Sequence, residues 1–309
     1  MNMPSSTMTE SSLEGAPFAP RPLAATRPMY WSIRRELWEN RWLYLAPLGV
    51  AALFLLGFLI SMTTLPDRMR SLSSLDPVKQ RAVIEKPYEV AAGLIMGAAF
   101  LVGLFYCLEA LHGERRDRSI LFWKSLPVSD RTTVLAKAAT VFALQPFTWA
   151  VTVVTYLIML LLSTIVLAGA GMSIAPLWTQ VAFFPRAMML GYHLLSVHTL
   201  WYAPIYAWLL LVSAWARRAP FLWAVLPPLA IGIAEKIAFN TSHFASMVQY
   251  RVAGPQQFSF NVPDMLAMDP MMYLDAARFL STPGLWTGLA LAAVFLAAAV
   301  RVRRLRGPI

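Results

Sequence analysis

The sequence predicts an all-α integral membrane protein with six transmembrane helices. Three observations predict it. The chain is 58% hydrophobic and only 14% charged, with a mean hydropathy of +0.56, whereas soluble domains are about 45–50% apolar and about 25% charged. Six apolar stretches are long enough to span a bilayer, and the positive charges gather on one side of the implied topology. A short amphipathic helix before the first span, and another between spans two and three, complete the expected architecture.

Six segments meet the length of about 20 apolar residues that a helix needs to cross the hydrocarbon. They cover residues 42–65, 90–111, 141–167, 187–215, 221–239 and 285–300. The fifth contains Pro227 and Pro228, and we expect a kink there, because neighbouring helices can satisfy the carbonyls that proline frees. The sixth is short but dense in apolar residues (LWTGLALAAVFLAAAV).

The chain begins with a polar segment that an amphipathic stretch follows. Residues 1–28 have no apolar region typical of a signal peptide and are rich in Ser, Thr and Pro, so we expect a disordered cytoplasmic tail there and a membrane domain over 29–309. In YWSIRRELWENRW, Trp31, Trp38 and Trp42 form a stripe beside Ile33 and Leu37. Tryptophan favours the membrane interface, so we expect a helix in the headgroup layer. The alternative is a cytoplasmic extension of the first span.

The distribution of Lys and Arg predicts the orientation. With six spans both termini lie on one side, which carries 17 of the 26 basic residues; the other side carries 9. Basic residues stay in the cytoplasm, so both termini are predicted to be cytoplasmic. The net charge of +10 then reflects topology, and we expect no nucleic-acid partner.

The stretch HGERRDRSILFWKSLPVSDRT, residues 112–132, is unusually charged for this chain. Its charged residues are Glu114, Arg115, Arg116, Asp117, Arg118, Lys124, Asp130 and Arg131. Within it, Ile120, Phe122, Trp123 and Leu126 lie on one arc of a short helix, with Leu121 as the exception. Pro127 ends this helix, and Ser129 or Asp130 then caps the helix that enters span three. Topology alone requires neither the acidic residues nor the aromatic pair.

The stretch ERRDRSILFWKSLPVSDRTTVLAKA resembles the loop between the second and third spans of ABC-2 type transporter permeases. The likeness is strongest to a bacterial group with six spans and no ATPase domain. RRELWENRWLY, LSTPGLWTGL and RVRRLR also resemble that group, so the likeness covers roughly residues 30–306.

The resemblance implies that this loop is a coupling helix that docks on a separate cytoplasmic ABC ATPase, which binds ATP and Mg²⁺. The residues implied in docking are Glu114, Arg115, Arg116, Asp117, Arg118, Phe122, Trp123, Lys124, Leu126, Pro127, Ser129 and Asp130. Phe122 and Trp123 are expected to contact either the ATPase or the inner ends of the spans. The resemblance also implies a homodimer or a paired permease in the bacterial inner membrane, with no cofactor and no catalytic residue on this chain.

Ionisable residues in or near the spans are functional candidates, because their burial in lipid is costly. Glu109 is expected to pair with Lys137 or a nearby arginine, or to form part of a gate. His193 and His198 are five residues apart, which in an α-helix directs them to different faces; we expect polar packing there and no metal site. Glu235 is expected to snorkel to the outer surface.

Two other function classes compete with the permease, namely an intramembrane enzyme of the protease kind and a membrane scaffold or assembly protein. The chain has no nucleotide-binding GxxxxGK[ST], no HExxH and no GxSxG motif. The two long outer segments, 66–89 and 240–283, include SHFASMVQYRV and MMYLDAARFL, which are compatible with short helices. Nothing in the sequence selects a substrate.

Overall fold

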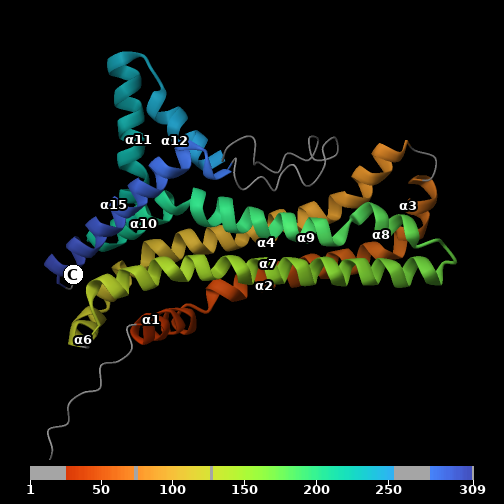
Figure 1. Ribbon diagram of the computed structural model, residues 1–309, viewed down its shortest axis with the longest axis horizontal. Coiled ribbons are helices and arrows are strands. Elements are labelled where there is room, and N and C mark those ends of the chain that lie inside the picture. The colour runs from red at the N-terminus through yellow and green to blue at the C-terminus, as the bar shows by residue number, and fades with distance from the viewer. Residues whose placement is uncertain (1–25, 73–75, 126–127, 254–278, 308–309) are drawn as a thin grey trace, which may run out of the picture.

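The computed structural model describes residues 26–72, 76–125, 128–253 and 279–307, and in these ranges it contains helices and no strand (Figure 1). Within these ranges, five helices are long and apolar enough to cross a membrane, or six if one bent pair forms a single span. The all-α class and the multi-pass membrane character are therefore confirmed. The predicted tail lies outside the described residues up to residue 25, and helix begins at Thr26, slightly before the predicted boundary.

The helices follow one another with short connections. In chain order they are α1 (Thr26–Glu39), α2 (Trp42–Ser61), the 3₁₀ turn η1 (Met62–Thr64), α3 (Leu65–Leu72), α4 (Pro77–Ala110), α5 (His112–Arg116), α6 (Ser119–Ser125), α7 (Asp130–Gly169), α8 (Ala175–Val181), α9 (Phe183–His193), the π-helix η2 (Leu194–Trp201), α10 (Ala203–Trp215), α11 (Pro220–Phe239), α12 (His243–Ala253) and α15 (Pro283–Leu305). A break at Asn40 and Arg41 separates α1 from the first spanning helix.

Two helices are much longer than the spans predicted from hydropathy. α4 has 34 residues and α7 has 40, so at 1.5 Å per residue they are about 50 and 60 Å long, against about 30 Å of hydrocarbon. In α7, threonines such as Thr148 and Thr152 donate to carbonyls four residues back at 2.8 Å, which satisfies their hydroxyls in the core.

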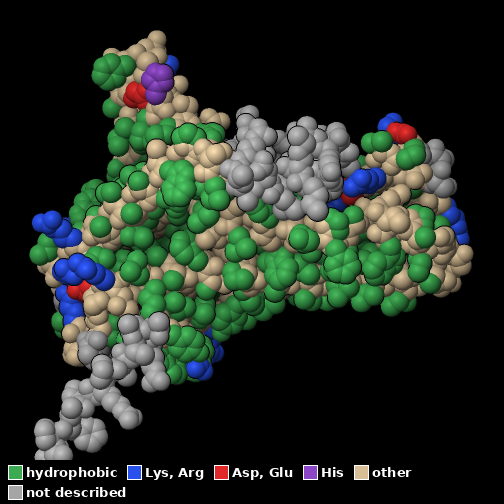
Figure 2. Space-filling view, in the orientation of Figure 1, with side chains coloured by type: hydrophobic (Ala, Val, Ile, Leu, Met, Phe, Trp, Pro, Cys, Tyr) green, Lys and Arg blue, Asp and Glu red, His purple; other side chains and the backbone are tan. Residues whose placement is uncertain are grey.

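In the view of Figure 2, Lys and Arg gather at the two ends of the long bundle, and apolar side chains cover the part between them.

The fourth predicted span, 187–215, is not one straight helix. Ala175–Trp201 and Ala203–Trp215 meet at an angle of 46°. Pro204 lies in the first turn of α10 and cannot donate a backbone hydrogen bond, and the π-helix η2 precedes the break. The backbone N–H of Tyr202 accordingly donates to Val197 O, five residues back, at 3.1 Å.

The fifth predicted span forms α11, which leaves the bundle at a steep angle (Figure 1). The structure buries Ala224 alone among its residues, so lipid or another protein must cover its apolar surface. α11 continues through both Pro227 and Pro228. SHFASMVQYRV forms α12, whereas most of MMYLDAARFL, like Leu126 and Pro127, lies outside the described residues.

Candidate functional site

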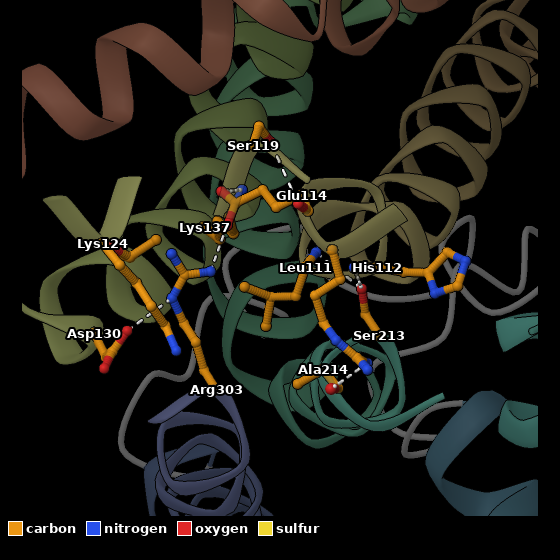
Figure 3. Close-up of polar contacts among 12 residues, drawn as sticks. Leu111, His112, Glu114, Ser119, Lys124, Asp130, Lys137, Ser213, Ala214 and Arg303 are labelled. Atoms are coloured by element: carbon orange, nitrogen blue, oxygen red, sulfur yellow. Dashed lines mark hydrogen bonds and ion pairs between the residues drawn. The ribbon is translucent and has the colours of Figure 1, made fainter. Parts of the chain in front are cut away.

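A buried group of charged side chains lies at the end of the bundle where α1, the 112–132 loop, the start of α7 and the end of α15 meet. We call it the charge cluster. It consists of Arg35 and Glu36 from α1, Glu114 from α5, Asp130 and Lys137 from α7, and Arg303 from α15. Figure 3 shows Glu114, Lys137, Asp130 and Arg303 turned toward one another. Since α1 and the end of α15 both reach this group, the two ends of the described chain lie at the same end of the bundle.

Lys137 is at the centre of the charge cluster, and its side chain is 3% exposed. Its Nζ lies 2.8 Å from Glu36 Oε1 and 3.0 Å from Glu114 Oε1. Arg35 donates to Glu36 Oε1 at 2.6 Å, and the hydroxyl of Tyr106 donates to Glu36 Oε2 at 2.9 Å. Burial raises the pKa of the Glu36 carboxyl, but Lys137 and Arg35 outweigh burial and hold that pKa below its usual value. Glu36 is therefore ionised at neutral pH.

Arg303 joins the last helix to the loop. Its Nη1 donates to Glu114 Oε2 in a short ion pair, and its Nε lies 3.0 Å from Asp130 Oδ1. Desolvation of buried charges costs several kcal/mol per ion, and only close partners with hydrogen bonds offset it. Each charge here has such a partner, so the cluster fixes one arrangement of four helices.

The first part of the loop is anchored through backbone groups. The Ser213 hydroxyl accepts from the backbone N–H of Leu111 and of His112, both at 2.9 Å. Arg115 is buried and donates to the carbonyls of Ala214 at 2.8 Å and Ala216 at 3.1 Å. The loop is thus attached to the end of α10, and Arg115 faces the bundle instead of a partner protein.

The short helix α6 divides its apolar residues between two faces. Ile120 is fully buried, while Leu121 and Phe122 are 58% and 59% exposed. Trp123 packs inward, with the Arg35 guanidinium 3.7 Å from its ring centroid. The arc predicted for Ile120, Phe122 and Trp123 is therefore wrong at Phe122, because residues 120 and 123 are one turn apart and residue 122 is not. Phe122 and Trp123 therefore face different surroundings. Trp123 contacts the bundle, and Phe122 is exposed and open to a partner.

The turn from α6 into α7 separates the two capping candidates. Ser129 is the N-cap of α7, and its Oγ accepts from the Thr132 N–H at 3.1 Å. Asp130 begins α7 and instead pairs with Arg303. The Lys124 ammonium is exposed and donates to Arg306 O at 3.3 Å.

The remaining charges of the loop are exposed. Arg116 lies 2.9 Å from Glu109 and 3.1 Å from Asp117, and Arg118 adopts a left-handed backbone conformation, with φ of 59°, between α5 and α6. Glu109 therefore pairs with a nearby arginine, while Lys137 binds Glu36 and Glu114. Exposed pairs of this kind contribute about 0–1 kcal/mol, so the Glu109 pair adds little to the rigidity of the loop.

His193 and His198 lie together, which contradicts the prediction that they face different ways. Their ring centroids are 5.5 Å apart, and His198 is 6.0 Å from Phe100. The cause is the π-helix η2: its hydrogen bonds run between residues five apart, so residues with this spacing are one turn apart. Both histidines line a cavity between α4 and α9.

Glu235 accepts hydrogen bonds at the start of α12. One carboxylate oxygen accepts from the Thr241 hydroxyl and the His243 N–H, each at 2.7 Å, and the other accepts from the Phe244 N–H at 2.8 Å. Glu235 is half-buried, and the predicted snorkelling did not include this role as a helix cap. The first N–H groups of a helix need such an acceptor.

Three members of the charge cluster were not singled out from the sequence. In the sequence, Arg35 and Glu36 lie in the amphipathic stretch YWSIRRELWENRW, and Arg303 lies in the basic segment RVRRLR. One signal was present: Glu36 follows Ile33 by three residues, which places a carboxylate beside the apolar stripe of that helix.

Comparison of the chain with protein-family models, with curated proteins and with solved structures found no match.

Proposed function

We propose that this chain is the membrane-spanning permease subunit of an ABC-2 type exporter, which forms the translocation pathway and couples to a separate cytoplasmic ATPase. The observation that supports the proposal most is α6, a short helix between two spanning helices whose outer face carries exposed Leu121 and Phe122. Exposed apolar and aromatic residues with charges around them are what a protein partner recognises.

The inner face of α6 supplies the transmission that coupling requires. Trp123 packs on Arg35 of α1, and Arg35 in turn pairs with Glu36, which Lys137 of α7 holds. Glu114, just before α6, binds Arg303 of α15. A force on α6 would therefore reach α1, α7 and α15 through these contacts, and such contiguous contacts are the physical requirement for coupling.

The other parts of the proposal follow from this role. ATP and Mg²⁺ are bound by the ATPase, and this chain has no catalytic residue. The end of the bundle with the charge cluster faces the cytoplasm of a bacterial inner membrane, together with both termini. Two permease copies engage a motor of two ATPases with two-fold symmetry, and the exposed apolar faces of α2 and α11 are available to pair them.

The test is co-purification with an ABC ATPase, sought first among the genes next to this one, together with stimulation of its ATP hydrolysis by the permease. Phe122→Ala removes an exposed ring that makes no inward anchor, and we expect binding to weaken by about 2 kcal/mol, or roughly 30-fold, as for an aromatic interface residue. Trp123→Ala is expected to retain binding but lower the stimulation, because it cuts the link to α1.

Phe184→Ala is the matched control, since Phe184 is 75% exposed on α9, far from α6 in the bundle. It should leave both measurements unchanged. If Phe122→Ala binds the ATPase as tightly as Phe184→Ala does, α6 is not the docking element and the proposal fails.

A further inference from the structure

A cavity of about 400 Å³ lies between α4, α7, α9 and η2, within the range of about 300–1,000 Å³ that is typical of ligand pockets. One stripe of α4 lines it along its length. The members of this stripe are Glu89, Ala92, Gly93, Met96, Gly97 and Phe100. Their spacings of three and four residues place them on one helix face, and the 11 helical steps from Glu89 to Phe100 span about 16 Å.

The cavity is open because the middle of this stripe contains two glycines, Gly93 and Gly97. A Cβ built on Gly93 or on Gly97 meets no atom within 4 Å. Met189 and Leu190 of α9 line the opposite side. The central part of the cavity is therefore apolar and has room for larger groups.

One end of the cavity carries charges that are unevenly satisfied. Glu85 Oε1 is bound by Arg186 at 2.7 Å and by Arg81 at 3.1 Å. Glu89 lies one turn further in, and its Oε2 is shielded from solvent with no hydrogen-bond partner in the part of the chain that the structure describes. A buried carboxylate oxygen without a donor is costly, so Glu89 is suited to accept a hydrogen bond from a ligand.

The other end of the cavity is aromatic. Phe100 lies 5.1 Å from Tyr202 and 6.0 Å from His198, measured between ring centroids. These rings close the cavity against α4 with apolar faces and edges, and offer no charged partner to a ligand.

We propose that this cavity binds a hydrophobic molecule with a protonated amine at one end. The ammonium group donates to Glu89, the apolar body lies along Gly93 and Gly97, and the far end contacts Phe100. The proposal depends on the geometry of α4, α7, α9 and η2 and not on α6, and therefore stands apart from the proposed coupling to an ATPase.

The experiment uses the purified full-length protein in lipid nanodiscs, without any ATPase. It measures how much each of three probes with the same 12-carbon alkyl group raises the melting temperature: dodecylamine, dodecanol and dodecanoate. A ligand that binds the folded state raises the melting temperature, and at a fixed free concentration the rise is larger for the ligand with the lower dissociation constant. We expect dodecylamine to bind the wild type at least tenfold more tightly than dodecanol. Glu89→Gln keeps the shape of the site and should remove that preference.

Gly97→Leu fills the cavity and should abolish stabilisation by dodecylamine. Gly49→Leu is its matched control, because a Cβ on Gly49 also meets no atom within 4 Å and this position lies on α2, away from the cavity. The lipid of the nanodisc takes up the same amount of probe with either variant, so a difference in stabilisation between the two variants reports binding in the cavity. Equal stabilisation of Gly97→Leu and Gly49→Leu would overturn the proposal, as would tighter binding of dodecanoate than dodecylamine. If Gly97→Leu does not fold, Glu89→Gln provides the test instead: a preference for dodecylamine over dodecanol that is the same as in the wild type would overturn the proposal.

Discussion

Replacement of Lys137 by methionine removes the central positive charge of the charge cluster and retains a side chain of similar length. Lys137 is 3% exposed and lies 2.8 Å from Glu36 and 3.0 Å from Glu114, so the change leaves two buried carboxylates without their shared partner. Loss of one member of a buried ion pair costs about 3–5 kcal/mol. Arg35 and Arg303 remain beside the two carboxylates, and we therefore expect a loss near the lower end, about 3 kcal/mol.

The pH dependence gives this prediction a second, independent readout. The folded-state pKa of Glu36 is lowered, so its contribution to stability is present above its unfolded pKa of about 4.3 and is lost as the pH falls through the lower folded value. In Lys137→Met the main lowering influence is gone, and burial then raises the pKa of the Glu36 carboxyl. We expect the stability difference from wild type to be smaller at pH 5 than at pH 8.

The assay is the free energy of unfolding from a titration with sodium dodecyl sulfate in mixed micelles, at both pH values. Lys124→Met is the matched control, because the Lys124 ammonium is exposed and contacts one carbonyl at 3.3 Å; its effect should stay within about 0.5 kcal/mol. The reasoning is refuted if Lys137→Met loses no more stability than Lys124→Met, or if its loss is the same at pH 5 and pH 8.

Three further predictions concern single contacts. Ser129→Ala removes the N-cap of α7 and should cost about 1 kcal/mol in the same unfolding titration; no loss would contradict the capping contact. Gly288→Ala places a methyl group 2.5 Å from the Arg251 guanidinium, which donates to Gly284 O at 2.6 Å, so amide exchange in α12 should rise, while unaltered exchange would show that Arg251 does not hold α12 in place. Glu235→Gln weakens the acceptors for the first N–H groups of α12 and should also speed exchange there, without a change in the core of α7.

The helical class and the position of most spans could be predicted from the sequence, because both depend on local composition. A run of about 20 apolar residues must form a helix in lipid, since no water is present to satisfy its backbone groups. The ends of the long helices could not be predicted in this way. The part of α4 before the predicted span, from Pro77, carries charges such as Arg81 and Glu85, which lower its hydropathy but do not stop the helix.

The candidate site was predictable only in part. The charged loop and its short helix were evident from the contrast between 112–132 and its apolar neighbours. The inward position of Arg115 and the outward position of Phe122 were not, because each depends on how α5 and α6 are oriented, and the left-handed backbone of Arg118 lies between these two short helices.

The sequence by itself determined how many charged side chains lie near the membrane, and tertiary structure alone decided which of them meet. Glu36 and Lys137 are 101 residues apart, and Glu114 and Arg303 are 189 apart; no local pattern relates them, and only the packing of α1, α7 and α15 around the loop removes them from water together. His193 and His198 illustrate the same limit over five residues. Their meeting depends on a π-helical backbone, which arises where α9 turns toward α10, and which the α-helical spacing assumed for the sequence does not contain.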